Sequence, residues 1–374
     1  MHVANSGVVY RATVIGAGPA GLSCLGNLLS HLPSTDKILW IDPLFQAGRL
    51  STYPAVPSNT KVCLFTRFAE ECPVFKAGEL ESLRVLKEEM DGQKGCQLKF
   101  AAELCKEITE KLLETENVKS IKSTAESLEY FDDTWTIKTK NDLVFKSKMV
   151  FLTTGSKPKS LNNLPDDSID LDDALNPEIL MKKIQNYDSV SVYGSSHSAM
   201  LVLKNLQGTA KKKNVTNYYR QPIKFASFPD PLNSPDKILH DNTGLKGEVA
   251  EWVKNWIELD ETELKNNFNL VRIKSGEKSD VEIGKNVNIF AVGYERNPLP
   301  KIILNHKETP HHQLDYTATG QLTSQSTPLP NIYGYGIAFP ERVKDLDGTD
   351  EAAVGMWKFM KHVKKSIELI LNKQ

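Results

Sequence analysis

The chain has 374 residues, 40% apolar and 25% charged, and its 46 basic and 47 acidic side chains give a net charge of −1. This composition is typical of a globular protein with room for more than one domain, and the near-neutral charge gives no reason to expect nucleic acid as a partner. No apolar run approaches the ~20 residues of a membrane span, so we expect no membrane partner. The first residues lack the pattern of a secretion signal, and the five cysteines form no CxxC pair, which favours a reduced, cytoplasmic protein.

The first predicted element is a buried parallel strand over residues 8–15, which are rich in β-branched side chains. It runs into the turn GAGPAG, and apolar residues at helical spacing follow. Glycines in this pattern allow a tight turn, a close approach to a diphosphate and packing of the helix on the strand. The sequence therefore predicts a dinucleotide site at this turn, made of Gly16, Gly18, Pro19, Ala20 and Gly21.

A second strand is predicted over residues 38–41 and ends in Asp42. An acid at this distance from the glycine turn binds ribose hydroxyls in dinucleotide-binding folds. The polar segment 48–60, with Arg49, Asn59 and Thr60, is predicted to be a loop, because its prolines break both helical and strand periodicity.

Two helices are predicted next, over residues 79–89 and 97–115. Short alternating runs between polar turns then predict an antiparallel β-meander over about 118–147. The apolar run 148–154 predicts a buried strand that ends at Gly155, and the proline-rich segment 156–173 reads as a linker.

A second strand–turn–helix unit begins with a strand at 189–193. Its turn carries serine where the first turn has its middle glycine, and alanine at the last position. A Cβ at the middle position crowds the phosphates, although a serine hydroxyl can donate to them, so a compensated site and a weakened site are both open. A histidine in the turn either touches the cofactor or makes helix-packing or solvent contacts. The predicted site residues here are Gly194, Ser195, Ser196, His197 and Ser198.

The next predicted strand, 215–219, ends in Arg220, and Lys211, Lys212 and Lys213 precede it. A cation at this strand end suits the 2′-phosphate of NADPH better than the free hydroxyl of NADH. The alternative is that these cations are solvated surface.

The proline-rich loop 225–247 precedes a predicted helix that holds Trp252 and Trp256. Long loops in compact domains are often functional. We therefore treat His240 and Asp241 as weak catalytic candidates, against the alternative of a surface excursion.

Toward the C-terminus, a strand at 287–292 stops at Gly293, and a strand at 331–336 closes on Gly336. A final helix is expected after 347–350, with Thr349 or Asp350 as its cap.

These motifs together resemble the flavoproteins with two dinucleotide-binding domains, the superfamily of thioredoxin reductase and of the flavin-containing and N-hydroxylating monooxygenases. The resemblance implies an α/β fold of two Rossmann-like, three-layer domains, with the NAD(P)-binding domain inserted into the FAD-binding domain and a β-meander on the latter. The implied boundaries are 1–157 and 286–374 for FAD, with 158–285 inserted for NAD(P)H.

The same resemblance implies residue roles. Gly16, Gly18, Gly21 and Asp42 would hold FAD, and Arg49 with the 48–60 loop would lie near the flavin ring. The two strand-end glycines, Gly155 and Gly293, match the crossings between domains. The stretch from Gly336 would approach the ribityl chain, although Tyr335-Gly336 stands where many members have Gly-Asp.

Three chemistries remain open. A monooxygenase would pass oxygen from O₂ to a small N or S nucleophile or a carbonyl substrate, with NADPH or NADH as reductant. A disulfide or small-molecule reductase without a CxxC dithiol would use a single thiol, for which Cys63 is the weak catalytic candidate, or no cysteine at all. A flavin-binding sensor would turn over little. No metal site is expected, because His311-His312 lacks a third ligand, and the sequence allows a homodimer.

Overall fold

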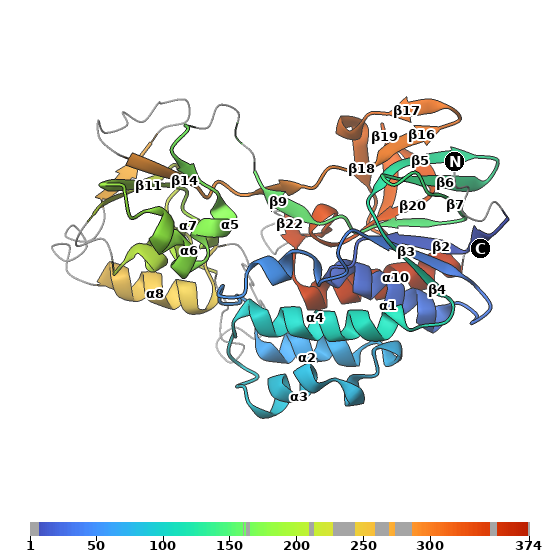
Figure 1. Cartoon of the computed structure of the whole chain (residues 1–374), viewed down its shortest axis with the longest axis horizontal. Coiled ribbons are helices and arrows are strands. Elements are labelled where there is room, and N and C mark those ends of the chain that lie inside the picture. The colour runs from blue at the N-terminus through green and yellow to red at the C-terminus, as the bar shows by residue number, and fades with distance from the viewer. Residues whose placement is uncertain are drawn as a thin grey trace.

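The computed structural model describes residues 7–159, 161, 165–208, 213–226, 244–258, 269–273, 286–344 and 350–372. Figure 1 shows two lobes, one built from both ends of the chain and one from its middle. The α/β fold expected from the sequence is confirmed, with a sheet that contains parallel strands in each lobe.

The larger lobe is built on a seven-stranded sheet, in the order β18-β19-β20-β8-β2-β3-β4. Five adjacent strands of this sheet, from β20 to β4, run parallel to one another, and the first glycine turn follows the middle one, β2. The strands β18 and β19 extend the sheet in antiparallel pairing. Every residue of β2 and β3 is buried, as their apolar runs predict. The strands are β18 (Leu314–Tyr316), β19 (Gln321–Ser324), β20 (Thr327–Gly334), β8 (Val150–Leu152), β2 (Ala12–Ile15), β3 (Ile38–Asp42) and β4 (Val118–Lys122).

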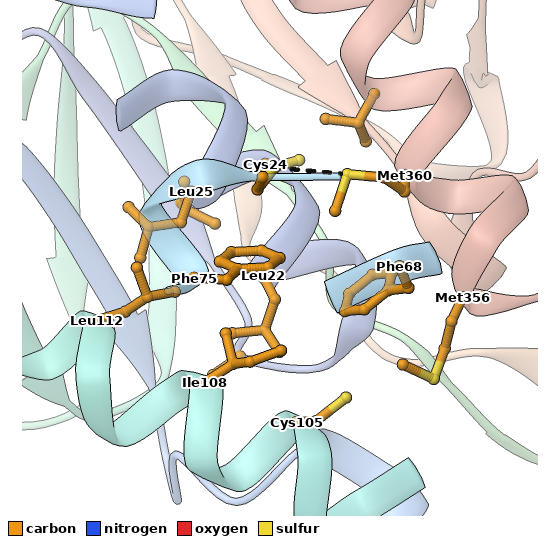
Figure 2. Close-up of a cluster of buried hydrophobic side chains, with 14 of the residues drawn as sticks. Leu22, Cys24, Leu25, Phe68, Phe75, Cys105, Ile108, Leu112, Met356 and Met360 are labelled. Carbon is orange, nitrogen blue, oxygen red and sulfur yellow. Dashed lines mark hydrogen bonds between the residues drawn. The ribbon is translucent and has the colours of Figure 1, made fainter. Parts of the chain in front are cut away.

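One face of this sheet is covered by helices α1 (Pro19–His31), α4 (Leu98–Leu113) and α10 (Met356–Leu371) (Figure 1). Two further helices, α2 (Val62–Glu70) and α3 (Glu81–Glu88), pack on the outside of this layer. Figure 2 shows their shared core, in which Leu22 of α1 and Ile108 of α4 lie close to the rings of Phe68 and Phe75. The expected helices at 79–89 and 97–115 are α3 and α4, whereas α2 was not predicted.

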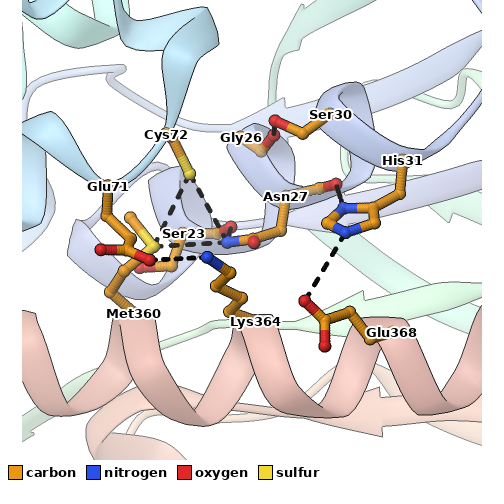
Figure 3. Close-up of polar contacts among 10 residues, drawn as sticks. All are labelled: Ser23, Gly26, Asn27, Ser30, His31, Glu71, Cys72, Met360, Lys364 and Glu368. Carbon is orange, nitrogen blue, oxygen red and sulfur yellow. Dashed lines mark hydrogen bonds and ion pairs between the residues drawn. The ribbon is translucent and has the colours of Figure 1, made fainter.

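A buried polar contact joins α1 to α10 within this core (Figure 3). Asn27 Nδ2 donates to the Ser23 carbonyl at 2.8 Å and lies 3.3 Å from Met360 Sδ and 3.6 Å from Cys72 Sγ. At the rim, Lys364 pairs with Glu71 at 2.7 Å. The Asn27–Met360 contact fixes the last helix against α1, and the Lys364–Glu71 pair fixes it against the end of α2.

The other face carries a six-stranded sheet, ordered β1-β7-β6-β5-β16-β17. It comprises β1 (Val9–Tyr10), β7 (Val144–Ser147), β6 (Thr134–Thr139), β5 (Ala125–Phe131), β16 (Lys301–Leu304) and β17 (Lys307–Thr309). The predicted meander begins at β5 and not at 118, because β4 follows a crossover helix and pairs in parallel with β3. The expected strand 8–15 is also divided: β1 pairs with β7, whereas β2 joins the parallel sheet.

The smaller lobe has a five-stranded parallel sheet, ordered β10-β14-β11-β12-β13. Its strands are β10 (Ser168–Ile169), β14 (Asn286–Phe290), β11 (Ser189–Tyr193), β12 (Asn214–Tyr219) and β13 (Asn269–Arg272), and its helices are α5 (Leu171–Ala174), α6 (Pro177–Lys183), α7 (His197–Leu206) and α8 (Gly247–Glu258). Since β14 pairs with β11, the inserted sheet reaches Phe290, past the expected boundary at 285. The segment expected to be a linker, 156–173, contributes β10 and the start of α5.

Two short antiparallel strands connect the lobes: β9 (Ser156–Pro158) and β15 (Tyr294–Arg296). Lys157 and Glu295 face each other across this ribbon with an ion pair of 3.4 Å. The last helix does not begin after 347–350, because β21 (Glu341–Lys344) pairs with β22 (Asp350–Ala353) and α10 is capped by Gly355. Within the described residues, no helix is long and apolar enough to span a bilayer.

Candidate functional site

The first glycine turn lies at the carboxyl end of β2, and each of its glycines meets a different environment. A Cβ on Gly16, whose φ is +115°, would lie 2.4 Å from the Thr153 carbonyl oxygen, and one on Gly21 would lie 2.1 Å from the Gly16 carbonyl oxygen. A Cβ on Gly18 meets no described atom closer than 3.8 Å. Gly16 and Gly21 are therefore required by packing, whereas the space beside Gly18 is open to a ligand.

Asp42, the last residue of β3, holds this turn in place. Its Oδ2 accepts a hydrogen bond from Ala17 N at 2.8 Å, and its Oδ1 accepts from Leu44 N and Phe45 N at 2.8 and 2.7 Å. A carboxylate offers about four acceptor sites. Three of them serve the backbone, so about one is left for a ribose hydroxyl.

The turn receives further support from residues that the sequence analysis did not single out. Trp40 Nε1 donates to the Gly16 carbonyl at 3.0 Å, and Thr153 Oγ1 donates to the Ile15 carbonyl at 2.8 Å. Thr153 lies in the TTGS run that follows the buried strand. A polar residue directly after an apolar strand was the feature of the sequence that could have indicated its role in the turn.

The 48–60 segment is not only loop, since Gly48–Thr52 form the 3-10 helix η1. Gly48 packs on the first turn, where a Cβ on it would lie 3.0 Å from Gly18 Cα. Arg49 reaches away to the inserted lobe and pairs with Asp172. Asn59 and Thr60 contact each other at 3.3 Å, and Asn59 lies close to the start of α8, because a Cβ on Gly247 would be 3.6 Å from Asn59 Cα.

Gly336, near the C-terminal end of the chain, lies against the first glycine turn. Its φ is +80°, and a Cβ on it would lie 2.5 Å from the Cβ of Ala20 in the first turn of α1. Tyr335, in place of the family's glycine, is buried and donates to the Thr319 carbonyl at 2.8 Å. The structure thus brings Gly16–Gly21, Gly48 and Gly336 together at one edge of the sheet.

The second turn lies at the carboxyl end of β11. Gly194 has φ +131°, and a Cβ on it would lie 2.3 Å from the Ala291 carbonyl oxygen, in parallel with Gly16. Ser196 is exposed at the N-cap of α7, and Ser195 and Ser198 are partly exposed. These three side chains border solvent where a diphosphate is expected.

His197 is engaged elsewhere. Its Nε2 accepts a hydrogen bond of 2.9 Å from Lys246 N, just before α8. Burial and the nearby Lys246 charge lower the pKa of His197, so its ring stays neutral and can accept this bond. This contact ties His197 to the segment that precedes α8, and a contact of His197 with the cofactor stays a prediction.

The cations around β12 are divided between its two ends. Arg220 is exposed just after the carboxyl end of the strand. Lys213 precedes the amino end, where its Nζ contacts the carbonyls of Gln185 and Tyr187. Because parallel strands share their carboxyl edge, only Arg220 lies at the edge that holds the second turn; Lys211 and Lys212 lie outside the described residues.

The crossing segments place Gly155 and Gly293 at the ends of the connecting ribbon, with φ +73° and +104°. Asn297 ties the two crossings together, because its Nδ2 donates to the Thr154 carbonyl at 2.7 Å and its N donates to the Gly155 carbonyl at 3.1 Å. These glycines therefore shape the junction between the lobes.

The thiols divide by burial, and none of the five is in a disulfide. Cys63 lies on α2 and is partly exposed, whereas Cys24, Cys72 and Cys105 are buried. Burial and the Glu71 charge raise the pKa of Cys72 to about 12, which makes it a poor nucleophile. His240 and Asp241 lie outside the described residues, as does most of the 225–247 loop.

The first turn fits FAD on three observations: the open space beside Gly18, the remaining acceptor site of Asp42, and the helix N-terminus of α1, which attracts diphosphate. Bound there, FAD would supply hydride acceptance and activation of O₂. In the part of the chain that the structure describes, no three His, Cys, Asp or Glu side chains gather as a metal site.

Comparison with known proteins agrees with this geometry. A family model described as FAD-NAD(P)-binding matches residues 13–157. Monooxygenase AgnR1 of Paecilomyces divaricatus is 34% identical over 392 aligned residues, which cover 95% of this chain and 96% of that protein.

Solved structures share the fold at low identity. The ornithine hydroxylase PvdA of Pseudomonas aeruginosa superimposes with a TM-score of 0.65 at 10% identity over 98% of this chain and all of that one. The bacillithiol disulfide reductase Bdr of Staphylococcus aureus gives 0.60 at 14% identity over 98% and 99%.

Proposed function

The chain belongs to the monooxygenase family of AgnR1, and we propose that it is an FAD-dependent monooxygenase that takes its electrons from NADPH. The observation that carries this is the pair of glycine turns at Gly16 and Gly194, each with a positive φ and each at the carboxyl end of a parallel strand in its own sheet. Such a pair provides separate sites for a flavin and for its reductant.

The larger lobe would bind FAD. Gly18 would border its diphosphate, Asp42 would accept from a ribose hydroxyl, and Gly336 would bring the end of β20 to the same helix N-terminus. These residues bind and orient the cofactor, and no acid–base side chain is required of them.

The inserted lobe would bind NADPH. Ser195, Ser196 and Ser198 offer hydroxyl donors to its diphosphate, and Arg220 would pair with the 2′-phosphate. The hydroxyl of Ser196 supports a compensated site, because the side chain is exposed at the N-cap and its donor is available.

The substrate would be a small molecule with a nucleophilic nitrogen or sulfur, or a carbonyl. A reductase that depends on Cys72 is disfavoured by the buried, weakly acidic thiol of that residue, and the sequence has no CxxC pair. Cys63, which is partly exposed, remains the candidate for a reductase with a single thiol.

The test measures flavin reduction by NADPH and the fate of the oxygen atoms of O₂. Purified protein should carry oxidised flavin, lose its visible absorbance on anaerobic addition of NADPH, and regain it with O₂. With isotopically labelled O₂ and a panel of amine, thioether and ketone substrates, one labelled oxygen atom should enter the product. Reduction without incorporation, with all oxygen recovered as H₂O₂, would instead identify an oxidase, and failure of NADPH to reduce the flavin would favour a sensor.

A further inference from the structure

Three side chains join the two lobes at one point. Arg49 of η1 pairs through Nη2 with Asp172 of α5, and the same Nη2 donates to the Tyr53 hydroxyl at 2.8 Å. Tyr53 in turn donates to Asp172 Oδ1 at 2.7 Å. The carboxylate of Asp172 thus accepts hydrogen bonds from both Arg49 and Tyr53, and we call these three residues the clamp.

The clamp lies within a wider contact between lobes. The ring of Tyr53, with Val56, packs against the hydrophobic core of the inserted lobe. Burial and the neighbouring Tyr294 raise the pKa of Tyr53, so its hydroxyl keeps the proton that it donates. The ion pair is only partly shielded, with 34% of the Arg49 and 30% of the Asp172 side chain exposed.

The clamp is also connected to the first glycine turn. Arg49 follows Gly48, and Gly48 packs on Gly18 so closely that a Cβ on Gly48 would lie 3.0 Å from Gly18 Cα. A ligand beside Gly18 therefore adjoins the backbone that carries Arg49. Arg49 also keeps a buried Nε–H for which the described residues offer no acceptor, and such a donor favours an oxygen ligand.

We propose that Asp172 is a positioning residue: by holding Arg49 and Tyr53 it docks the inserted lobe on the FAD site, and FAD binding tightens this docking through η1. The inference rests on the proposed function, because it assumes that FAD binds at Gly18. The coupling is reciprocal, since a ligand that favours the docked arrangement binds more weakly when docking is lost. Loss of the clamp therefore lowers FAD affinity, although Asp172 does not belong to the FAD-binding lobe.

The experiment compares Asp172→Asn with Asp173→Asn, a control on the same helix whose carboxylate pairs with Lys183 inside the inserted lobe. FAD affinity is measured by flavin fluorescence, and hydrogen exchange is followed at 48–53 and 171–174 with and without FAD. In the wild type, FAD should slow exchange in both segments. Asp172→Asn should weaken FAD binding about fivefold or more and abolish the FAD effect at 171–174, whereas Asp173→Asn should retain both.

One further variant keeps the test decisive. Asp172→Glu should restore part of the FAD affinity, because it keeps the carboxylate that accepts from Arg49 and Tyr53. Exchange in α10 reports whether each variant is folded. Wild-type affinity and protection in Asp172→Asn would overturn the positioning role alone, whereas a wild-type protein that binds no FAD would overturn the proposed function with it.

Discussion

Gly336 and Ala20 lie so close that a Cβ on the first would be 2.5 Å from the Cβ of the second. This contact holds the end of β20 against the first turn of α1. It joins residues more than three hundred positions apart at the site where the FAD diphosphate is proposed to bind.

We expect Gly336→Ala to destabilise the protein by about 2 kcal/mol or more, since it overfills a packed contact at a positive φ. Denaturant unfolding of the apo-protein measures the change. Gly78→Ala is the matched control, because its Cβ would enter open space, and it should leave stability nearly unchanged. Equal midpoints for the two variants would contradict the tight contact.

Gly18→Ala should separate cofactor binding from folding. Gly18 has φ −81°, which alanine adopts readily, and its Cβ would meet no described atom closer than 3.8 Å. The apo-protein should therefore unfold within about 1 kcal/mol of the wild type, whereas FAD binding should weaken tenfold or more as the methyl group enters the proposed diphosphate space. Gly16→Ala should instead lose stability, because its Cβ would lie 2.4 Å from Thr153 O. Unchanged FAD affinity in Gly18→Ala would show that FAD does not bind at this turn.

The sequence was sufficient to predict the two glycine turns, because a β-branched run, a glycine pattern and a helical period occur there in direct succession. It was not sufficient to assign β4, since a short alternating strand reads the same in a meander and in a parallel sheet. The end of the inserted lobe was misplaced for a similar reason, because a strand before Gly293 gives no sign of which sheet it joins.

The clamp could not be predicted either. Asp172 lies in a segment that reads as a polar linker, and its partners Arg49 and Tyr53 are more than a hundred residues away. Only the tertiary arrangement makes them neighbours, and no local pattern encodes it.

Arg220→Ala should reduce the preference for NADPH over NADH. A charge-assisted contact contributes about 1.5–3 kcal/mol, so kcat/KM for NADPH should fall about ten- to a hundredfold, with little change for NADH. Lys213→Ala is the control, because Lys213 contacts carbonyls at the opposite end of β12. An equal loss with both nucleotides would assign Arg220 to general structure and not to the 2′-phosphate.

Cys72 should make the protein less stable at alkaline pH. Burial and the Glu71 charge raise the pKa of this thiol from its ordinary value of 9.0 to about 12. Below pH 9 the thiol is protonated in both the folded and the unfolded chain; between pH 9 and 12 the unfolded chain alone releases the proton. Unfolding is therefore favoured as pH rises, by up to about 1.4 kcal/mol per pH unit from this group.

Cys72→Ala isolates that contribution. The variant should be less stable at neutral pH because of the lost contacts with Asn27 and Met360 (Figure 3), and its free energy of unfolding should fall less steeply above pH 9. Urea unfolding at several pH values gives both slopes, and the other buried thiols and the tyrosines cancel in the comparison. Parallel slopes would show that Cys72 ionises as readily in the folded chain as in the unfolded one, which would reopen a role for this thiol in the chemistry.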